Sequence, residues 1–222
     1  MYSFIKRFFD ILFAFIAIAI LLIPLLPIII GLAITGEHYV FYLQERIGQY
    51  LKKFNIIKFA TMLKNSPNIG TGTITTRNDS RILPMGKFLR MTKLNELPQI
   101  LNVLIGEMSF VGPRPLVAKQ FGYYHIEIQT QIMENKPGIT GIGSIVFRDE
   151  EELVSKSTLP PQEFYQTVIS PYKGALEIWY RNNKSFYVDF MILFLTAWVV
   201  IFKKSKLVYS VFKNLPKNIH KS

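Results

Sequence analysis

An uninterrupted apolar segment near the amino end constrains this chain more than any other feature. Residues 11–36 contain no charged side chain, and Lys6, Arg7 and Asp10 come shortly before them. At about 1.5 Å per residue, a helix of this length can cross a hydrocarbon core of about 30 Å. The run is longer than the h-region of a secretory signal peptide, and no A-x-A cleavage site follows it. The segment therefore predicts insertion into a bilayer.

Two features favour a helix that enters the bilayer, bends and returns. Pro24 and Pro27 fall near the middle of the segment, where the missing N–H and the ring predict a kink or break near Ile23. Both flanks are basic, and the positive-inside rule then places both ends in the cytoplasm. A bitopic helix with a proline kink explains the segment equally well, so both interpretations stay open. The basic flanking residues are Lys6 and Arg7 before the segment, and Arg46, Lys52, Lys53 and Lys58 after it.

Composition narrows the class of partner. Half of the residues are hydrophobic and 18% are charged, against about a quarter in soluble domains. The formal net charge is +11, and ten of these charges lie after residue 36. A basic body beside a membrane segment favours anionic lipids or phosphorylated substrates. Nucleic acid is disfavoured, because no helix-turn-helix, zinc or RNA-binding motif accompanies the charge.

The residue inventory also limits the chemistry. The chain has no cysteine and three histidines, which excludes disulfides and a cysteine nucleophile and disfavours multi-histidine metal sites and histidine-centred triads. Carboxylates and basic side chains must therefore carry any reaction.

The remaining pattern predicts an α+β fold that is mostly helical. Residues 38–48 and 54–59 read as a small β-hairpin, and residues 66–80 as a loop. Apolar residues recur at helical spacing through residues 88–105, with Pro98 predicting that one helix ends near Leu97 and another starts after it. Residues 190–202 are uncharged but too short to span a bilayer, which favours an amphipathic interfacial or a buried helix. We expect a re-entrant membrane helix at 1–36, a catalytic domain at 37–202 and a basic tail at 203–222.

Two segments carry candidate functional groups. The stretch GEMSFVGPRP at residues 106–115 predicts a stiff loop from which Arg114 projects, and a guanidinium there suits either bidentate contact with phosphate oxygens or an ion pair that holds the loop. The acidic run at residues 149–152 contains possible Mg²⁺ ligands, although a solvated helix start is the commoner explanation.

Several motifs together resemble a known family. They are KRFFD (6–10), QERIG (44–48), KF (58–59), FLR (88–90), NELPQILNVLIGEMSFVGPRP (95–115), KPGITG (136–141) and VDFMIL (188–193). In this order, and over nearly the whole chain, they are similar to the bacterial sugar transferases, the monotopic polyprenol-phosphate phosphoglycosyl transferases. The chain resembles the short, catalytic-domain-only form of that family.

The resemblance implies an activity, a location and partners. It implies transfer of a sugar 1-phosphate from a nucleotide sugar, usually a UDP-sugar, to a polyprenyl phosphate, usually undecaprenyl phosphate, with release of UMP. This would be the first membrane step of polysaccharide or glycoconjugate assembly, such as exopolysaccharide, O-antigen or capsule. It further implies Mg²⁺ as cofactor, a re-entrant helix with Pro24 at the bend, and a location in the bacterial inner membrane facing the cytoplasm. Membrane lipids are expected partners, nucleic acid is not, and a homodimer through apolar faces stays open.

One position departs from the family pattern. Relatives carry an adjacent Asp-Glu pair, in which Asp forms a covalent phosphosugar intermediate and Glu holds Mg²⁺, whereas this chain has Asn95 and Glu96. An amide is a poor nucleophile toward phosphorus. Three hypotheses follow: Glu96 is the nucleophile, the lipid phosphate attacks the donor directly while Glu96 binds Mg²⁺, or the protein is inactive and binds nucleotide sugar or scaffolds a glycan-assembly complex. The intact surrounding block favours an active enzyme.

Other basic positions follow from the same resemblance. Arg114 matches the arginine of the Gly-Pro-Arg-Pro loop and is expected to bind donor phosphates, and Arg90 and Lys58 match basic positions near the active site. Ala60 stands where relatives usually have Arg or Lys, so one basic contact is missing. The identity of the sugar does not follow from the sequence.

Overall fold

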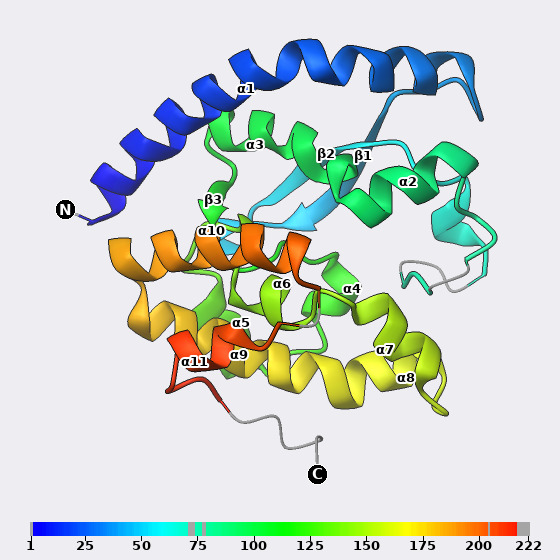
Figure 1. The fold of residues 1–222 in the computed structure, drawn as a ribbon. Helices are drawn as coiled ribbons and strands as arrows, with labels where there is room; N and C mark the ends of the chain where they lie inside the picture. Colours follow the sequence, from blue (N-terminus) through cyan, green and yellow to red (C-terminus); the bar gives the residue numbers. More distant parts are fainter. Residues whose placement is uncertain (1, 71–73, 77–78, 204, 217–222) are drawn as a thin grey trace.

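The fold consists of helices arranged around two small sheets (Figure 1). A computed structural model describes residues 2–70, 74–76, 79–203 and 205–216. The mostly helical α+β class is as predicted. The helices in chain order are α1 (Tyr2–Ile34), α2 (Pro84–Thr92), α3 (Ile100–Ile105), α4 (Ala118–Phe121), α5 (Ile126–Ile132), α6 (Ile142–Val146), α7 (Glu150–Lys156), α8 (Pro161–Phe164), α9 (Ser170–Asn183), α10 (Phe186–Ile201) and α11 (Leu207–Val211). A π-helical turn, Tyr165–Ile169, joins α8 to α9.

The predicted hairpin is confirmed. β1 (Phe41–Ile47) and β2 (Lys53–Phe59) pair antiparallel, with Phe41 opposite Phe59 and Ile47 opposite Lys53. A second pair, β3 (Ser109–Val111) and β4 (Gly138–Thr140), is parallel, and its strands are too short to show a period in the sequence.

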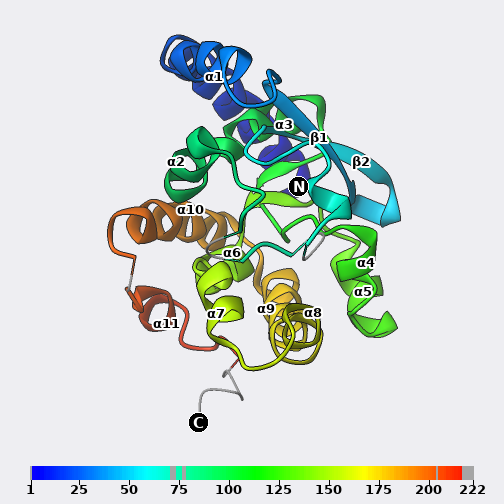
Figure 2. The same cartoon turned by 90° about the vertical axis from the view of Figure 1, so that its right-hand side faces the viewer.

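These elements form two layers. Figures 1 and 2 show α1, α2, α3 and the hairpin above, and α7, α8, α9 and α11 below, with α10 along the side of the lower layer that faces α1. The largest buried cluster lies in the lower layer and joins α6, α9 and α10 through residues such as Ile142, Leu176, Ile192 and Leu195. Because burial of apolar area is the main stabilising term, this cluster is the main hydrophobic core of the described residues.

The apolar amino-terminal segment forms one long helix. α1 is long and apolar enough to cross a membrane, and its only buried residues are Asp10, Ala14 and Leu32. Helical structure continues through Pro24 and Pro27, and the helix changes direction along its length rather than breaking (Figure 1). A bend is therefore present, while re-entrant insertion stays a prediction.

The KRFFD motif attaches this helix to the body. The two terminal nitrogens of Arg7 donate to the carbonyl oxygens of Val103 and Leu104 at 2.5 and 2.8 Å. Asp10 is buried and accepts from the Ser109 hydroxyl at 3.0 Å. Lys6 forms an ion pair with Asp189, within the VDFMIL motif. These contacts hold the membrane helix in a fixed orientation relative to the rest of the chain.

The predicted helix end near Leu97 is wrong. α2 ends five residues earlier at Thr92, because Lys93 adopts a left-handed conformation with φ of 62° and donates its N–H to the Arg90 carbonyl. A 3₁₀ segment, η3 (Leu94–Gln99), follows and contains Pro98. Proline is tolerated there because residues just before the start of a new helix need no N–H partner. Consequently, Asn95 and Glu96 lie on a tight turn packed against β2 instead of at the end of a regular helix.

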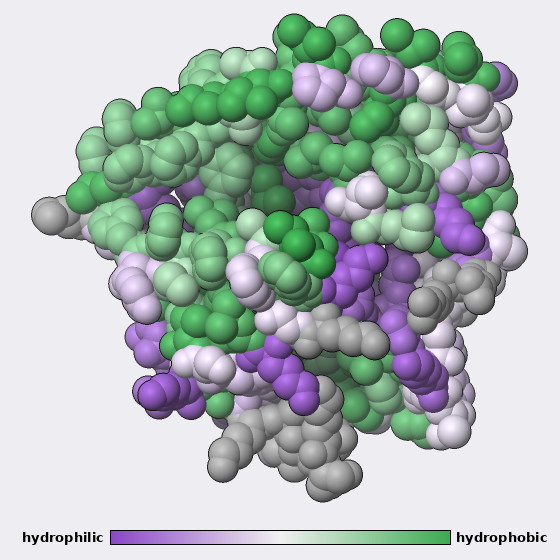
Figure 3. Space-filling model, in the orientation of Figure 1, coloured by the Kyte–Doolittle hydropathy of each residue, from purple (hydrophilic) through white to green (hydrophobic). Residues whose placement is uncertain are grey.

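The second apolar run is helical, as predicted. One face of α10 is buried through Ile192, Leu195 and Val199, while Phe190, Phe194 and Ile201 on the other side are 66, 45 and 72% exposed. Figure 3 shows apolar residues over the upper rim formed by α1 and around α10, with a group of hydrophilic residues to the right of α10, below α2. Of the expected basic tail, residues 204 and 217–222 lie outside the described part, and α11 lies within it.

Candidate active site

A pocket of about 480 Å³ lies between the two layers. The hairpin, α2 and η3 supply its upper wall, and α6, α7, α9 and α10 supply the lower one. Its charged lining comprises the seven basic residues Arg46, Lys58, Arg90, Lys93, Arg114, Arg148 and Lys173 and the three acidic residues Glu96, Glu150 and Glu151. Such an excess of positive charge in a concave site suits a ligand that carries several negative charges.

Glu96, Arg114 and Lys58 form the centre of the upper wall. Arg114 donates to both carboxylate oxygens of Glu96, with N–O distances of 2.6 and 3.3 Å, and Lys58 Nζ lies 3.4 Å from the same carboxylate. The Glu96 and Lys58 side chains are only 15 and 14% exposed. The structure thus brings together three residues predicted to act at the site, and we call them the Glu96 cluster.

The cluster sets the charge state of its members. Burial opposes ionisation of Glu96, but the charges of Arg114 and Lys58 outweigh it and hold the pKa of Glu96 well below its usual range. Burial lowers the pKa of Lys58 to about 7, against the opposing effect of Glu96. Glu96 is therefore a permanent anion of low basicity, while Lys58 changes charge near neutral pH.

Asn95 lies beside this cluster with a free acceptor. Its side chain is 6% exposed and lines the pocket. Its amide oxygen is buried without a hydrogen-bond partner in the described part of the chain. Buried polar atoms are almost always paired. We therefore expect this oxygen to bind a group that arrives with the ligand.

The loop after β3 positions Arg114. The Gly112 N–H donates to Thr140 at 2.9 Å, and the Gly138 N–H donates to Pro113 at 2.8 Å. A Cβ on Gly112 would lie 2.3 Å from the Lys136 carbonyl oxygen, and one on Gly138 would lie 2.1 Å from the Gly112 nitrogen. Both glycines are required by this close approach, which explains why the GPRP and KPGITG motifs occur together.

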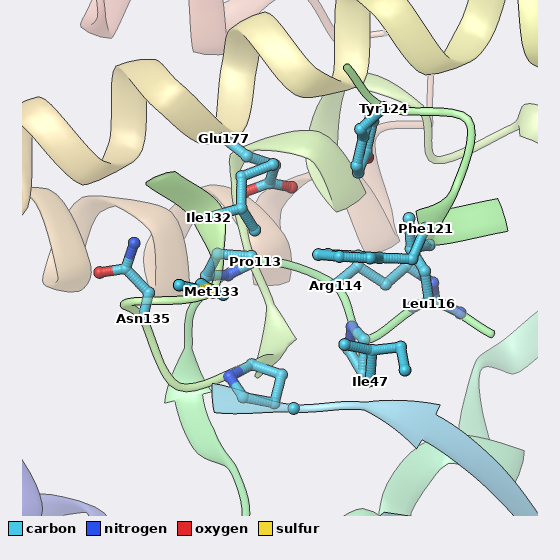
Figure 4. Close-up of a pocket in the computed structure, with 13 residues that line it drawn as sticks. Ile47, Pro113, Arg114, Leu116, Phe121, Tyr124, Ile132, Met133, Asn135 and Glu177 are labelled. Atoms are coloured by element: carbon cyan, nitrogen blue, oxygen red, sulfur yellow. The ribbon is translucent and has the colours of Figure 1, made fainter. Parts of the chain in front are cut away.

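A second, smaller cavity lies behind the same loop (Figure 4). Its volume of about 20 Å³ is room for one water molecule. Glu177 and Asn135 line it, and Glu177 Oε2 and Asn135 Nδ2 have no hydrogen-bond partner among the described residues. The Glu177 carboxyl also accepts from the Arg114 backbone N–H, and burial raises its pKa to about 8. A neutral Glu177 therefore supports the Arg114 loop from below.

The lower wall contains the expected acidic run, and the remaining predicted cation, Arg90, belongs to α2 of the upper wall. The acidic residues 149–152 form the start of helix α7, which was the commoner explanation of this run. Glu151 pairs with Arg90 of α2, and Glu150 pairs with Lys173 of α9. Arg90 is thus at the pocket as predicted, but it reaches across to α7 and not to Glu96.

Several pocket residues escaped the sequence analysis. Arg46 lies in the QERIG motif but was predicted only as a basic flanking residue, and Lys173 and Glu177 lie in α9, outside the motifs. Burial of a charged residue on the apolar face of a helix, as at Lys173 and Glu177, is the available signal. The other predicted residue, Pro24, belongs to α1 and does not line the pocket.

The pocket offers few protein ligands for Mg²⁺. Among the described residues, no three His, Cys, Asp or Glu side chains gather in a way that would hold a metal ion. Mg²⁺, however, usually takes only one or two protein carboxylates and completes its shell with water and substrate phosphates. Glu96 and the free amide oxygen of Asn95 fit that limited role, in which the ion arrives with the substrate.

Fold and site together define a class of protein: a membrane-associated enzyme with a cationic pocket for phosphate-bearing ligands beside an apolar helix. The sequence model of the family described as Bacterial sugar transferase matches residues 1–203. The chain belongs to this family.

Individual relatives are similar over most of the chain. "UDP-galactose-lipid carrier transferase" of Erwinia amylovora is 33% identical over 212 residues, which is 89% of this chain and 40% of that protein. "Undecaprenyl-phosphate galactose phosphotransferase" of Salmonella typhimurium is 32% identical, over 89% of this chain and 40% of that protein. The chain thus spans about two fifths of these longer relatives. It spans 83% of "Exopolysaccharide production protein ExoY" of Sinorhizobium fredii, at 33% identity over 86% of its own length.

Proposed function

We propose that this chain transfers a sugar 1-phosphate from a UDP-sugar to undecaprenyl phosphate, giving undecaprenyl diphosphate sugar and UMP. The observation that carries the proposal is the Glu96 cluster, in which Arg114 and Lys58 converge on a buried carboxylate at a cationic pocket. Family membership and the names of the Erwinia and Salmonella relatives supply the substrate class.

The transfer is a direct displacement at phosphorus. An oxygen of the lipid phosphate attacks the phosphorus that bears the sugar, and the bond from that phosphorus to the bridging diphosphate oxygen breaks. The bridging oxygen leaves with the electron pair as part of UMP, so no proton has to move. In-line positioning and charge neutralisation are the main demands of such a reaction.

The geometry favours this route over a covalent intermediate on Glu96. Both Glu96 oxygens accept from Arg114, and the low pKa makes the carboxylate a weak nucleophile. Asn95 is an amide and cannot take the role of the family's aspartate. The lipid phosphate is then the remaining nucleophile.

Each residue of the cluster has a role in this scheme. Arg114, with its planar fork of donors, neutralises oxygens of the transferred phosphate. Lys58 adds a second cation, and Glu96 orients both. Asn95 accepts from, or coordinates, a group of the incoming substrate through its free oxygen. Mg²⁺ held by Glu96 and Asn95 would supply further neutralisation of the diphosphate.

The site is assigned to the cytoplasmic face of the bacterial inner membrane. The basic flanks of the apolar helix support this orientation, and the tether through Lys6, Arg7 and Asp10 would hold the pocket close to the lipid headgroups. There a soluble nucleotide sugar and a membrane-bound phosphate can both reach the cluster.

The assay for this function is UMP release from the membrane-inserted protein. The full chain is incubated with undecaprenyl phosphate, Mg²⁺ and a panel of UDP-sugars, with Glu96→Gln as the inactive control. Release that depends on one UDP-sugar supports the proposal and identifies the sugar. No release across the panel, with activity appearing in Asn95→Asp, would instead establish an inactive family member.

A further inference from the structure

Ser144 and Arg148 lie in the same pocket but outside the Glu96 cluster. Ser144 is in α6, and Arg148 follows four residues later on the turn between α6 and α7. Both line the pocket. The Ser144 hydroxyl and the Arg148 Nε are buried, and neither has a hydrogen-bond partner within the described ranges.

Arg148 differs from three neighbouring cations in having no carboxylate counter-ion, although the Nε atoms of Arg46 and Arg90 are likewise buried without a partner among the described residues. Arg90 has Glu151 as counter-ion, Lys173 has Glu150, and Arg114 has Glu96. Across the described residues, no ion pair involves Arg148. A buried donor without an acceptor is rare in native proteins, because its lost hydration is not replaced. Two such donors, four residues apart and lining one pocket, indicate an acceptor that comes from the ligand.

We propose that Ser144 and Arg148 form a second phosphate subsite, which holds a phosphate that does not undergo substitution at the Glu96 cluster. The proposal rests on the proposed function, which brings three phosphates together, two from the donor and one from the acceptor. The Glu96 cluster accounts for the transferred phosphate only. A guanidinium edge of Nε and one terminal nitrogen matches two phosphate oxygens, and a hydroxyl supplies a third donor.

The shared chemistry is a phosphate ester, and its source is either the nucleotide or the lipid. The test uses the full chain in lipid nanodiscs and compares wild type with Arg148→Gln and Ser144→Ala. Arg181→Gln is the matched control, because Arg181 is on α9, pairs with Glu134 and does not line the pocket. Two quantities are measured: the Kd for UMP by titration, and the KM for undecaprenyl phosphate at saturating UDP-sugar.

A subsite for the nucleotide phosphate predicts that Arg148→Gln raises the Kd for UMP about tenfold, that Ser144→Ala raises it about threefold, and that the control leaves it unchanged. A subsite for the lipid phosphate predicts the same changes in the KM for undecaprenyl phosphate, with the Kd for UMP unchanged. Wild-type values of both quantities in a folded Arg148→Gln protein would overturn the subsite.

The two proposals fail separately in this experiment. If wild type releases no UMP but Arg148→Gln still weakens UMP binding, the subsite stands and the transferase function fails. If Arg148→Gln turns over with wild-type constants, the function stands and the subsite fails. Thermal unfolding of each variant confirms that Arg148→Gln is folded.

Discussion

The central charged groups of the upper wall are paired with one another, whereas Arg148 of the lower wall has no ion-pair partner among the described residues. On the upper wall, Glu96 already binds Arg114 and Lys58, so these cations are held in place before any substrate arrives. On the lower wall, Arg148 and Ser144 have buried donors without partners in the described structure. A preorganised centre suits the step in which charge develops, because it needs no reorganisation during the reaction. Unpaired donors instead suit the binding of a group that stays unchanged.

The largest effect is expected from removing the fork of Arg114. Arg114→Lys keeps the charge but cannot contact both Glu96 oxygens and a phosphate at once, since a lysine ammonium lacks the planar fork. We expect UMP release at saturating substrate to fall by about 100-fold or more, as on loss of other preorganised donors. Initial rates of UMP release measure it. If Arg114→Lys keeps half of the activity, the upper wall needs only charge and the contrast between the walls is lost.

An intermediate effect is expected from the titration of Lys58. Burial lowers its pKa to about 7, so in the free enzyme Lys58 is charged below that pH and neutral above it. The KM for the UDP-sugar should therefore rise roughly tenfold between pH 6 and 8.5, one tenfold step corresponding to about 1.4 kcal/mol.

Lys58→Arg is the matched variant for this titration, because arginine keeps its charge over the whole range. Its KM should stay flat with pH. The UDP-sugar is the right probe, because its diphosphate does not titrate in that interval. A KM that rises equally in both proteins would assign the pH dependence to another group.

The smallest effect on activity is expected from Glu177, which lies behind Arg114. Burial raises its pKa to about 8 from an ordinary value of 4.5. Between these two pH values the unfolded chain loses the proton and the folded chain keeps it, so this group lowers the free energy of unfolding as pH rises. Below pH 4.5 it makes no difference. Glu177→Gln is isosteric and cannot ionise, so at pH 8 it should be more stable than wild type by on the order of 4 kcal/mol.

Unfolding followed at pH 4.5 and pH 8 measures that difference. The gain of Glu177→Gln should be present at pH 8 and absent at pH 4.5, with UMP release changed by less than about threefold, because Gln still accepts from the Arg114 N–H. An equal gain at both pH values would show that the carboxyl does not titrate as described.

The comparison of the walls also shows what the sequence could predict. Glu96 and Arg114 of the upper wall belong to the motif Asn95 to Pro115, and they were predicted, with Lys58 and Arg90, from the family resemblance. The lower wall is assembled from α6, α7, α9 and α10. Its pair Lys173–Glu150, and the pair Arg90–Glu151 that joins the two walls, connect residues far apart in the chain. No local pattern encodes such pairs. The helix boundary was misplaced for a related reason: Lys93 takes a left-handed conformation that sequence propensity disfavours for a residue other than glycine.

For the membrane helix, too, the sequence predicted the local features but not the contacts with the rest of the chain. Its length, its prolines and its basic flanks predicted an apolar helix with a bend, and α1 has both features (Figure 1). The buried contacts of Asp10 with Ser109 and of Lys6 with Asp189 depend on tertiary packing and had no sequence signal beyond the motifs themselves.

UMP production with and without the lipid acceptor tests the central claim most directly. Wild type in nanodiscs is mixed with Mg²⁺ and the UDP-sugar that supports turnover, and UMP is quantified in the first turnover, with Asn95→Asp as the control that restores a carboxylate nucleophile. Direct displacement predicts UMP from wild type only when undecaprenyl phosphate is present, and no phosphosugar adduct on the protein by mass spectrometry. A stoichiometric burst of UMP from wild type without lipid, accompanied by an adduct on Glu96, would contradict it.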